Sequence, residues 1–147
     1  MNLTINTTVY DTMKVQAEAA YPLECVGFLF GTEAGNERHL KLARPVVNSM
    51  DGDQRRRFVI DPKDYLAAEK YSLANNIALL GIYHSHPDHP ARPSQHDLKQ
   101  AVPYFSYIIL SIMNEELTDT TSWQLNDHGR FEEEPIEIKN ENTINLN

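Results

Sequence analysis

An unbroken apolar run at residues 77–83 constrains this 147-residue chain more than any other stretch. A short run of this kind, bounded by turn residues, predicts a buried strand. His84 and His86 follow it directly. Side chains two residues apart in an extended chain point to the same side, so the two imidazoles can face one point. The loop that follows is stiffened by prolines and can continue neither a strand nor a helix.

The end of this loop carries a possible third partner for the two histidines. Ser94 closes the loop, and Asp97 lies three residues further on, in the first turn of the expected helix. A bent path of this kind can bring the Asp97 carboxylate back towards His84 and His86. Two histidines and one carboxylate form a three-ligand set for a hydrolytic zinc ion, with the fourth position left to water.

Each part of this segment also has a purely structural interpretation. Ser94 and Asp97 are spaced almost as in a capping box. In this motif the serine side chain accepts from a backbone N–H of the first turn, and the acid side chain accepts from the backbone N–H of the serine. A His-x-His pair at a strand end is often a polar, half-exposed start of a loop. His89 and His96 are rival metal ligands, which we rank lower because His89 lies within the loop and His96 on a different helix face from Asp97.

The combination of His-Ser-His-Pro at 84–87 with Ser-Gln-His-Asp at 94–97 resembles the signature of the JAMM (MPN-plus) metallopeptidases. That family also requires an upstream glutamate in a Pro-x-Glu-x-x-Gly setting. Residues 22–27 supply this setting, with Glu24 as the glutamate, and an apolar strand follows. The resemblance covers most of the chain, from the first expected helix to the strand that begins at Tyr107.

The resemblance implies a mechanism of amide hydrolysis without a covalent intermediate. One Zn²⁺ per chain, held by His84, His86 and Asp97, would supply the attacking water. Glu24 would take the proton of that water and pass it to the departing amine, and the Ser94 hydroxyl would donate to the oxyanion. Without the family match, Glu24 would be interpreted as an exposed turn glutamate.

The family also implies a kind of substrate. Small stand-alone bacterial-type members resemble this chain in length and lack the long insertions with which eukaryotic deubiquitinases grip ubiquitin. We therefore expect cleavage of an amide or isopeptide bond after the Gly-Gly tail of a ubiquitin-like or sulfur-carrier protein. The tail could bind by adding a strand to a sheet edge near the metal. The alternatives are a general small-peptide or amidase-type zinc hydrolase and a metal-free MPN-type interaction scaffold.

Composition and charge narrow the class of partner. A formal net charge of −8 argues against nucleic acid, because phosphate binding needs clustered positive charge, and the basic run at 55–57 is short. No stretch has the pattern of a membrane span or a signal segment, so we expect no membrane partner. The single cysteine, Cys25, fits a cytoplasmic protein and is interpreted as a core residue, not a nucleophile. The oligomeric state stays open.

Hydrophobic patterning predicts an α+β fold, because strands and helices are mixed without a regular βαβ alternation. We expect one domain over residues 1–139 and a frayed tail at 140–147. The resemblance implies a curved mixed central sheet flanked by helices, with the metal at a strand end. Residues 48–57 are interpreted as a mobile loop, either a flap beside the substrate or a solvated loop.

The individual elements are expected as follows. A first helix starts at Thr8 and ends before Pro22, and a second is opened by Asp61 and Pro62. The expected strands lie at 26–30, 39–47, 58–60, 77–83, 107–112, 122–125 and 135–139, with a hairpin turn at 126–129.

Overall fold

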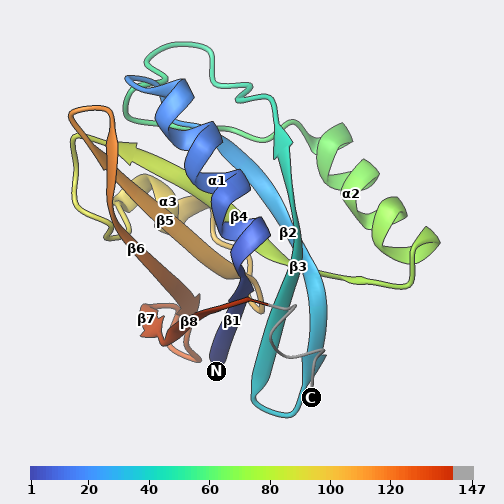
Figure 1. The fold of residues 1–147 in the computed structure, drawn as a ribbon. Coiled ribbons are helices and arrows are strands. Elements are labelled where there is room, and N and C mark those ends of the chain that lie inside the picture. Colours follow the sequence, from blue (N-terminus) through green and yellow to red (C-terminus); the bar gives the residue numbers. More distant parts are fainter. Residues whose placement is uncertain (141–147) are drawn as a thin grey trace.

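The computed structural model describes residues 1–140, and within them eight strands form one mixed sheet accompanied by three helices (Figure 1). The strand order is β7-β6-β5-β4-β2-β3-β1-β8. The elements are β1 (Asn2–Asn6), α1 (Thr7–Ala20), β2 (Val26–Ala34), β3 (Glu37–Val46), α2 (Pro62–Ala74), β4 (Ala78–Pro87), α3 (Gln95–Gln100), β5 (Ser106–Met113), β6 (Glu116–Leu125), β7 (Phe131–Glu134) and β8 (Ile136–Lys139). The predicted α+β class is confirmed. Of the tail expected at 140–147, residues 141–147 lie outside the described residues.

The sheet is so strongly curved that it almost closes on itself. Its two edge strands, β7 and β8, are separated in the chain by Pro135 alone. The Pro135 carbonyl accepts a hydrogen bond from the Leu3 backbone N–H at 3.0 Å, which ties this junction to β1. The β1–β3, β1–β8 and β4–β5 pairs are parallel, whereas the remaining pairs are antiparallel. The expected curved mixed sheet is therefore present.

Two hydrophobic clusters cover the two faces of the sheet. One contains the buried side of α1, where Val9, Met13 and Ala17 follow the four-residue spacing expected of a helix that packs on one face. The other contains Ala68 of α2, with Tyr65 and Tyr71 packed against it. Strands β4 and β5 contribute to both clusters, which explains why their sequences are continuous apolar runs.

Three predicted details are wrong. Helix α1 starts after Asn6, whose side chain accepts from the Thr8 N–H at 3.1 Å, so Asn6 and not Thr8 is the N-cap. Residues 58–60 are not a strand, although Phe58 and Ile60 are buried in the core as their apolar side chains predict. Strand β6 begins at Glu116, six residues before the expected start, since Leu117 is the one apolar residue in its first half and gives only a weak hydrophobic signal.

Arg38 is fully buried within β3, an unusual place for a charged side chain. Its Nη1 donates to Ser106 Oγ at 2.8 Å, and its Nε lies 3.6 Å from Glu33 Oε1. The guanidinium also stacks 4.3 Å from the ring centroid of Tyr104. These contacts tie the β2–β3 hairpin to the beginning of β5, at the end of β5 away from the candidate site.

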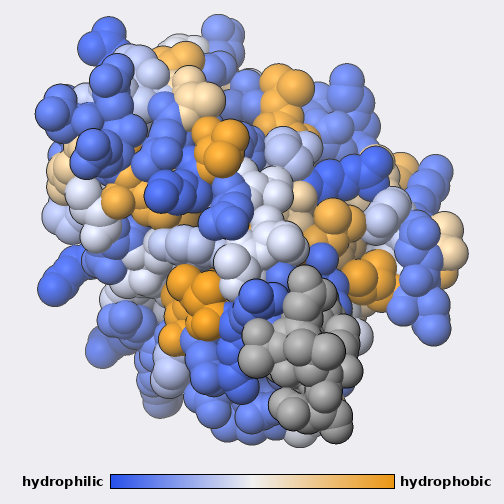
Figure 2. Space-filling model, viewed as in Figure 1, coloured by the Kyte–Doolittle hydropathy of each residue, from blue (hydrophilic) through white to orange (hydrophobic). Residues whose placement is uncertain are grey.

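The surface is dominated by polar side chains. On the face shown in Figure 2, hydrophilic residues predominate and the hydrophobic ones form small, separate groups. Within residues 1–140, each helix falls short of the length and apolar character required to cross a membrane.

Candidate active site

Strand β4 carries both predicted histidine ligands near its C-terminal end. His84 pairs in register with Val26 of β2, and His86 with Ser111 of β5, so the strand is fixed on both sides. The two imidazoles point to the same side, as the two-residue spacing predicts, and their Nε2 atoms lie 3.1 Å apart. Both side chains are buried, with exposed fractions of 1% and 7%.

Asp97 completes a three-residue cluster from the first turn of α3. Its Oδ1 lies 3.2 Å from His84 Nε2 and its Oδ2 lies 3.2 Å from His86 Nε2. A capping box holds the carboxylate there: Ser94 Oγ accepts from the Asp97 N–H, and Asp97 Oδ2 accepts from the Ser94 N–H. The capping box predicted for Ser94 and Asp97 is therefore present, and the same contacts place the Asp97 carboxylate beside the two histidines.

The three side chains lie close enough together to hold one metal ion. A tetrahedron with ligand bonds of about 2.0 Å has edges of roughly 3.3 Å. The two Nε2 atoms lie 3.1 Å apart, and each lies 3.2 Å from an Asp97 oxygen, Oδ1 for His84 and Oδ2 for His86, so each of these separations is near such an edge. The group formed by His84, His86 and Asp97 can thus hold a metal, and Zn²⁺ suits its imidazole and carboxylate donors.

The protonation of the cluster also suits a metal. His86 Nδ1 lies 2.9 Å from the Pro90 carbonyl oxygen, so this nitrogen donates and Nε2 keeps its lone pair for the cluster. Burial lowers the pKa of His84, which favours the neutral ring. Burial alone would raise the pKa of Asp97, but the histidine partners and the Ser94 N–H outweigh it and hold that pKa well below its usual range.

Glu24 lies in the short connection between α1 and β2 and is buried, with an exposed fraction of 5%. The alternative of an exposed turn glutamate is therefore wrong. Its backbone N–H donates to the Gln54 carbonyl at 2.7 Å, and its own carbonyl accepts from Asn48 Nδ2 at 3.4 Å. Within the described residues, Glu24 Oε1 has no hydrogen-bond partner. Burial, reinforced by the charges of Asp97 and Asp53, raises the pKa of Glu24 to about 9.

One pocket brings three of the five predicted site residues together. It has a volume of about 380 Å³, and Glu24, His86 and Ser94 all line it. The remaining lining residues are Arg56, His89, Pro90 and Arg92. His84 and Asp97 are not part of this lining but contact His86 directly, so the carboxyl group, the hydroxyl group and the metal ligands share one site.

The rival ligands and the cysteine have other surroundings. His89 is exposed and lines the pocket, but it is not part of the ligand group. His96 Nε2 lies 3.0 Å from the Phe58 carbonyl oxygen and its ring packs against the Phe58 ring. Burial raises the pKa of the Cys25 thiol to about 11, which agrees with its interpretation as a core residue.

Two supporting residues were missed by the sequence analysis. Ser85 Oγ accepts from the Cys25 N–H at 2.8 Å. This bond holds Cys25, the residue next to Glu24, against strand β4, which carries the two histidines. Asn48 organises residues 48–57, because its Oδ1 accepts from the N–H groups of Met50 and Val59. An asparagine that bonds the backbone two residues further on is a known turn signal and could have revealed the second role.

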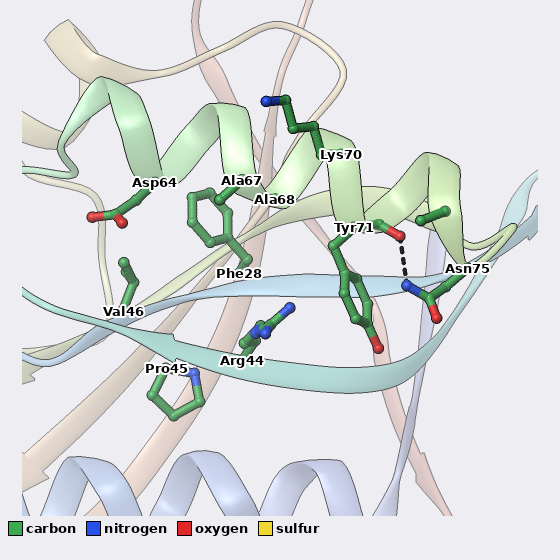
Figure 3. A pocket seen from close by; sticks show the side chains of 11 residues that line it. Phe28, Arg44, Pro45, Val46, Asp64, Ala67, Ala68, Lys70, Tyr71 and Asn75 are labelled. Carbon is green, nitrogen blue, oxygen red and sulfur yellow. Dashed lines mark hydrogen bonds between the residues drawn. The ribbon is translucent and has the colours of Figure 1, made fainter.

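A second pocket, of about 520 Å³, lies between α2 and strands β2 and β3 (Figure 3). Arg44 stacks over the Tyr71 ring there, 4.5 Å from its centroid, and Asn75 Nδ2 donates to the Tyr71 carbonyl at 2.9 Å. None of the five predicted site residues lines it. The chemistry of the described residues is therefore concentrated in the pocket beside β4.

A curved mixed sheet with a buried His-His-Asp group beside a buried glutamate is the arrangement of a JAMM-type domain. Residues 6–126 match the family of prokaryotic homologs of the JAB domain, and the chain belongs to that family. It is 32% identical to a protein from Desulfitobacterium hafniense whose solution structure superposes with a TM-score of 0.81, over 94% of this chain and 93% of that one.

Three named relatives are similar to the chain. A desampylase from Pyrococcus furiosus is 31% identical over 80% of this chain and 77% of its own length. A probable TtuB-protein conjugate cleaving protease from Thermus thermophilus is 46% identical over 32% of this chain and 34% of its own length. The tail tip assembly protein K of Escherichia phage N15 is 30% identical over 61% of this chain. The aligned part spans about a third of the length of the latter two relatives.

Proposed function

We propose that this JAMM-type enzyme is a zinc-dependent isopeptidase that cleaves the amide or isopeptide bond after the Gly-Gly tail of a ubiquitin-like or sulfur-carrier protein. The observation that carries the proposal is one pocket in which a buried carboxyl group, Glu24, lies beside a compact, buried His-His-Asp group. The names of two relatives, a desampylase and a TtuB-protein conjugate cleaving protease, support the class of substrate.

His84, His86 and Asp97 would hold the Zn²⁺ ion. When bound there, the ion would lower the pKa of a coordinated water from about 9 on free aqueous zinc towards roughly 7. The remaining chemistry is performed by groups of the chain itself.

Glu24 is proposed as the general base. In the metal-free protein its pKa of about 9 keeps the carboxyl group protonated at neutral pH. A cation close by favours the carboxylate and brings this pKa down, towards the range in which a proton can be both taken up and released. Glu24 would accept the proton from the attacking water and deliver it to the departing amine.

Ser94 is proposed as the oxyanion donor. Its Oγ already accepts the Asp97 N–H at 3.1 Å, which occupies a lone pair and leaves the hydroxyl hydrogen free to donate. The cap and the catalytic role are therefore compatible in one side chain. A donor of this kind contributes about 3 kcal/mol to transition-state stabilisation.

The placement of the site bears on how the carrier tail would bind. Strand β4 is paired with β2 and β5, and the edge strands β7 and β8 carry none of the five site residues. We therefore propose that the tail enters along the pocket beside Glu24 and does not add to an edge of the sheet.

We also propose that residues 1–139 form one domain. The free, buried Cys25 supports the further proposal of a cytoplasmic location.

A direct assay tests the function. Zinc-loaded protein is incubated with a carrier conjugate whose Gly-Gly tail is attached to lysine or to an amino acid, and in parallel with short peptides that lack this tail. We expect cleavage of the conjugates, with loss of activity in Glu24→Gln and His86→Ala. Cleavage of the short peptides at equal efficiency would favour a general peptidase, and no cleavage of any substrate would refute the proposal.

A further inference from the structure

The two predicted histidine ligands differ in how the outer nitrogen of each ring is held. His86 Nδ1 lies 2.9 Å from the Pro90 carbonyl oxygen and donates to it. Within residues 1–140, His84 Nδ1 has no hydrogen-bond partner, and the His84 ring packs against the Phe58 ring with centroids 4.6 Å apart. A hydrogen bond from one nitrogen of a neutral imidazole decides that the other nitrogen keeps the lone pair. The tautomer of His86 therefore depends on where the Pro90 carbonyl lies.

The Pro90 carbonyl is the middle one of three consecutive carbonyls that all accept hydrogen bonds. The His89 carbonyl accepts from Ser111 Oγ of β5 at 2.5 Å. The Ala91 carbonyl accepts from Thr121 Oγ1 of β6 at 2.6 Å. Two hydroxyl groups from neighbouring strands thus hold the loop on both sides of Pro90, and the ligand histidine donates to the carbonyl between them.

Both hydroxyl groups are fixed in direction. The indole Nε1 of Trp123 can only donate, and it donates to Thr121 Oγ1 at 2.8 Å, so the hydroxyl hydrogen of Thr121 is left for the Ala91 carbonyl. Ser111 is buried and pairs in register with His86 across β5 and β4. Because a carbonyl can only accept, the Ser111 hydroxyl also donates to the loop.

We propose that Ser111 and Thr121 are positioning residues for the metal ligand His86. By holding the carbonyls on either side of Pro90, they place the Pro90 carbonyl where His86 Nδ1–H can donate to it, so that His86 Nε2 presents its lone pair to the metal. Both residues act through the loop, and neither is assigned a step in the hydrolysis. This inference rests on the metal site of the proposed function.

A simpler role for the two hydroxyls would be to satisfy the loop carbonyls, because a buried carbonyl needs a donor. The loop has one internal contact at the same place, since the Pro90 carbonyl also accepts from the Arg92 N–H at 2.9 Å. If that contact alone placed Pro90, removal of the hydroxyls would lower stability and leave His86 unchanged. The two roles therefore differ in what they predict for the histidine ring.

The tautomer of His86 is measured in the metal-free protein by nitrogen NMR at alkaline pH, where the ring is neutral. The wild type should carry the ring hydrogen on Nδ1, although an isolated histidine side chain prefers it on Nε2. In Thr121→Val we expect a substantial population with the hydrogen on Nε2. Thr121→Ser keeps the hydroxyl and should keep the wild-type tautomer. Ser111→Ala, at a buried position, is the second variant and should act in the same direction as Thr121→Val.

The affinity for Zn²⁺ is the second measurement, made by competition with a chelator. Loss of a partner that orients a ligating histidine weakens metal binding by about 10–100-fold, so the Kd should rise about tenfold in Thr121→Val and in Ser111→Ala. Thr120→Val is the matched control on the same strand, because Thr120 Oγ1 lies 3.0 Å from Tyr10 OH and takes part in a hydrogen bond of the same kind. It should keep both the wild-type Kd and the wild-type tautomer.

The inference would be overturned if either the tautomer or the Kd stayed unchanged in Thr121→Val. A wild-type His86 with its hydrogen on Nε2 would also overturn it, and so would an equal rise of the Kd in Thr120→Val. A wild type that binds no zinc would refute the proposed function. The tautomer measurement would still decide the role of the two hydroxyls, because it needs neither metal nor substrate.

Discussion

Ser94 and Asp97 hold each other by two reciprocal hydrogen bonds, with Ser94 Oγ accepting at 3.1 Å and Asp97 Oδ2 accepting at 2.8 Å. The same contact caps α3 and fixes the carboxylate next to His84 and His86. The capping role and the proposed catalytic role of Ser94 therefore share one side chain. Substitution can separate them.

The first prediction concerns Ser94. Ser94→Ala removes the capping oxygen and the oxyanion donor, so we expect a loss of about 1 kcal/mol in stability together with a fall in kcat of tens-fold or more. Ser94→Asp keeps a good cap but places negative charge beside developing negative charge. It should stay stable and be equally inactive. Zinc content is measured alongside the rates, and an active, zinc-loaded Ser94→Asp protein would leave Ser94 with the capping role alone.

The second prediction concerns the metal. Gentle purification should yield about one zinc ion per chain, held by His84, His86 and Asp97. Because a ligand that binds the folded state stabilises it, by about 2.7 kcal/mol at a hundredfold excess over Kd, chelation should lower Tm. The shift should shrink in His86→Ala and persist in His89→Ala, whose ring lines the pocket outside the ligand group. Wild-type protein that stays metal-free in added zinc would refute the assignment.

The third prediction concerns Glu24 as general base. Glu24→Gln preserves the size of the side chain but cannot accept a proton. We expect unchanged zinc content and a loss in kcat of about 10²–10⁴-fold, the usual contribution of a positioned base. Steady-state kinetics and metal analysis on the same preparation provide the check. Retention of most of the wild-type kcat would remove Glu24 from the mechanism.

The fourth prediction concerns pH. In metal-free protein, folded Glu24 keeps its proton up to a pKa of about 9, whereas the unfolded chain loses it near 4.5. The folded state binds more protons in this window, so its stability falls as pH rises from about 4.5 to 9, by at most about 1.4 kcal/mol per pH unit. Glu24→Gln lacks this dependence. As pH rises, the free energy of unfolding of Glu24→Gln should therefore increasingly exceed that of the wild type.

Urea denaturation at pH 5, 7 and 9 in the presence of a chelator measures this difference. Glu69→Gln, at an exposed position of α2, is the matched control. A stability difference between Glu24→Gln and the wild type that stays constant over the three pH values would mean that burial does not perturb the carboxyl group.

Much of the site could be predicted because its information is local. His84, His86, Ser94 and Asp97 lie within one short segment, where strand alternation and a capping box dictate their directions. Glu24 is different. Its burial depends on hydrogen bonds from Asn48 and to Gln54, both distant in sequence, and no local pattern encodes them. Only the family resemblance pointed to it.

The misplaced elements have the same physical origin. Strand β1 gave little signal because its partners, β3 and β8, come from distant parts of the chain. The polar first half of β6 pairs with β5 through its backbone, which the side-chain pattern does not report. Arg38 lies on the same face of β3 as the buried Leu40, where a charge is unexpected, yet Ser106 and Tyr104 provide it with partners inside.

The curvature that brings β7 and β8 together at Pro135 has a consequence for biosynthesis. Strand β1 is synthesised before its partner β8, and Leu3 pairs with Ile136, so one side of β1 stays unpaired until nearly all the described chain has been made. Unpaired strand edges attract other chains, and contacts between distant residues form slowly. The edge of β1 therefore stays unpaired while the strands between β1 and β8 are made, and β8, the last of the described strands, is the one that covers it.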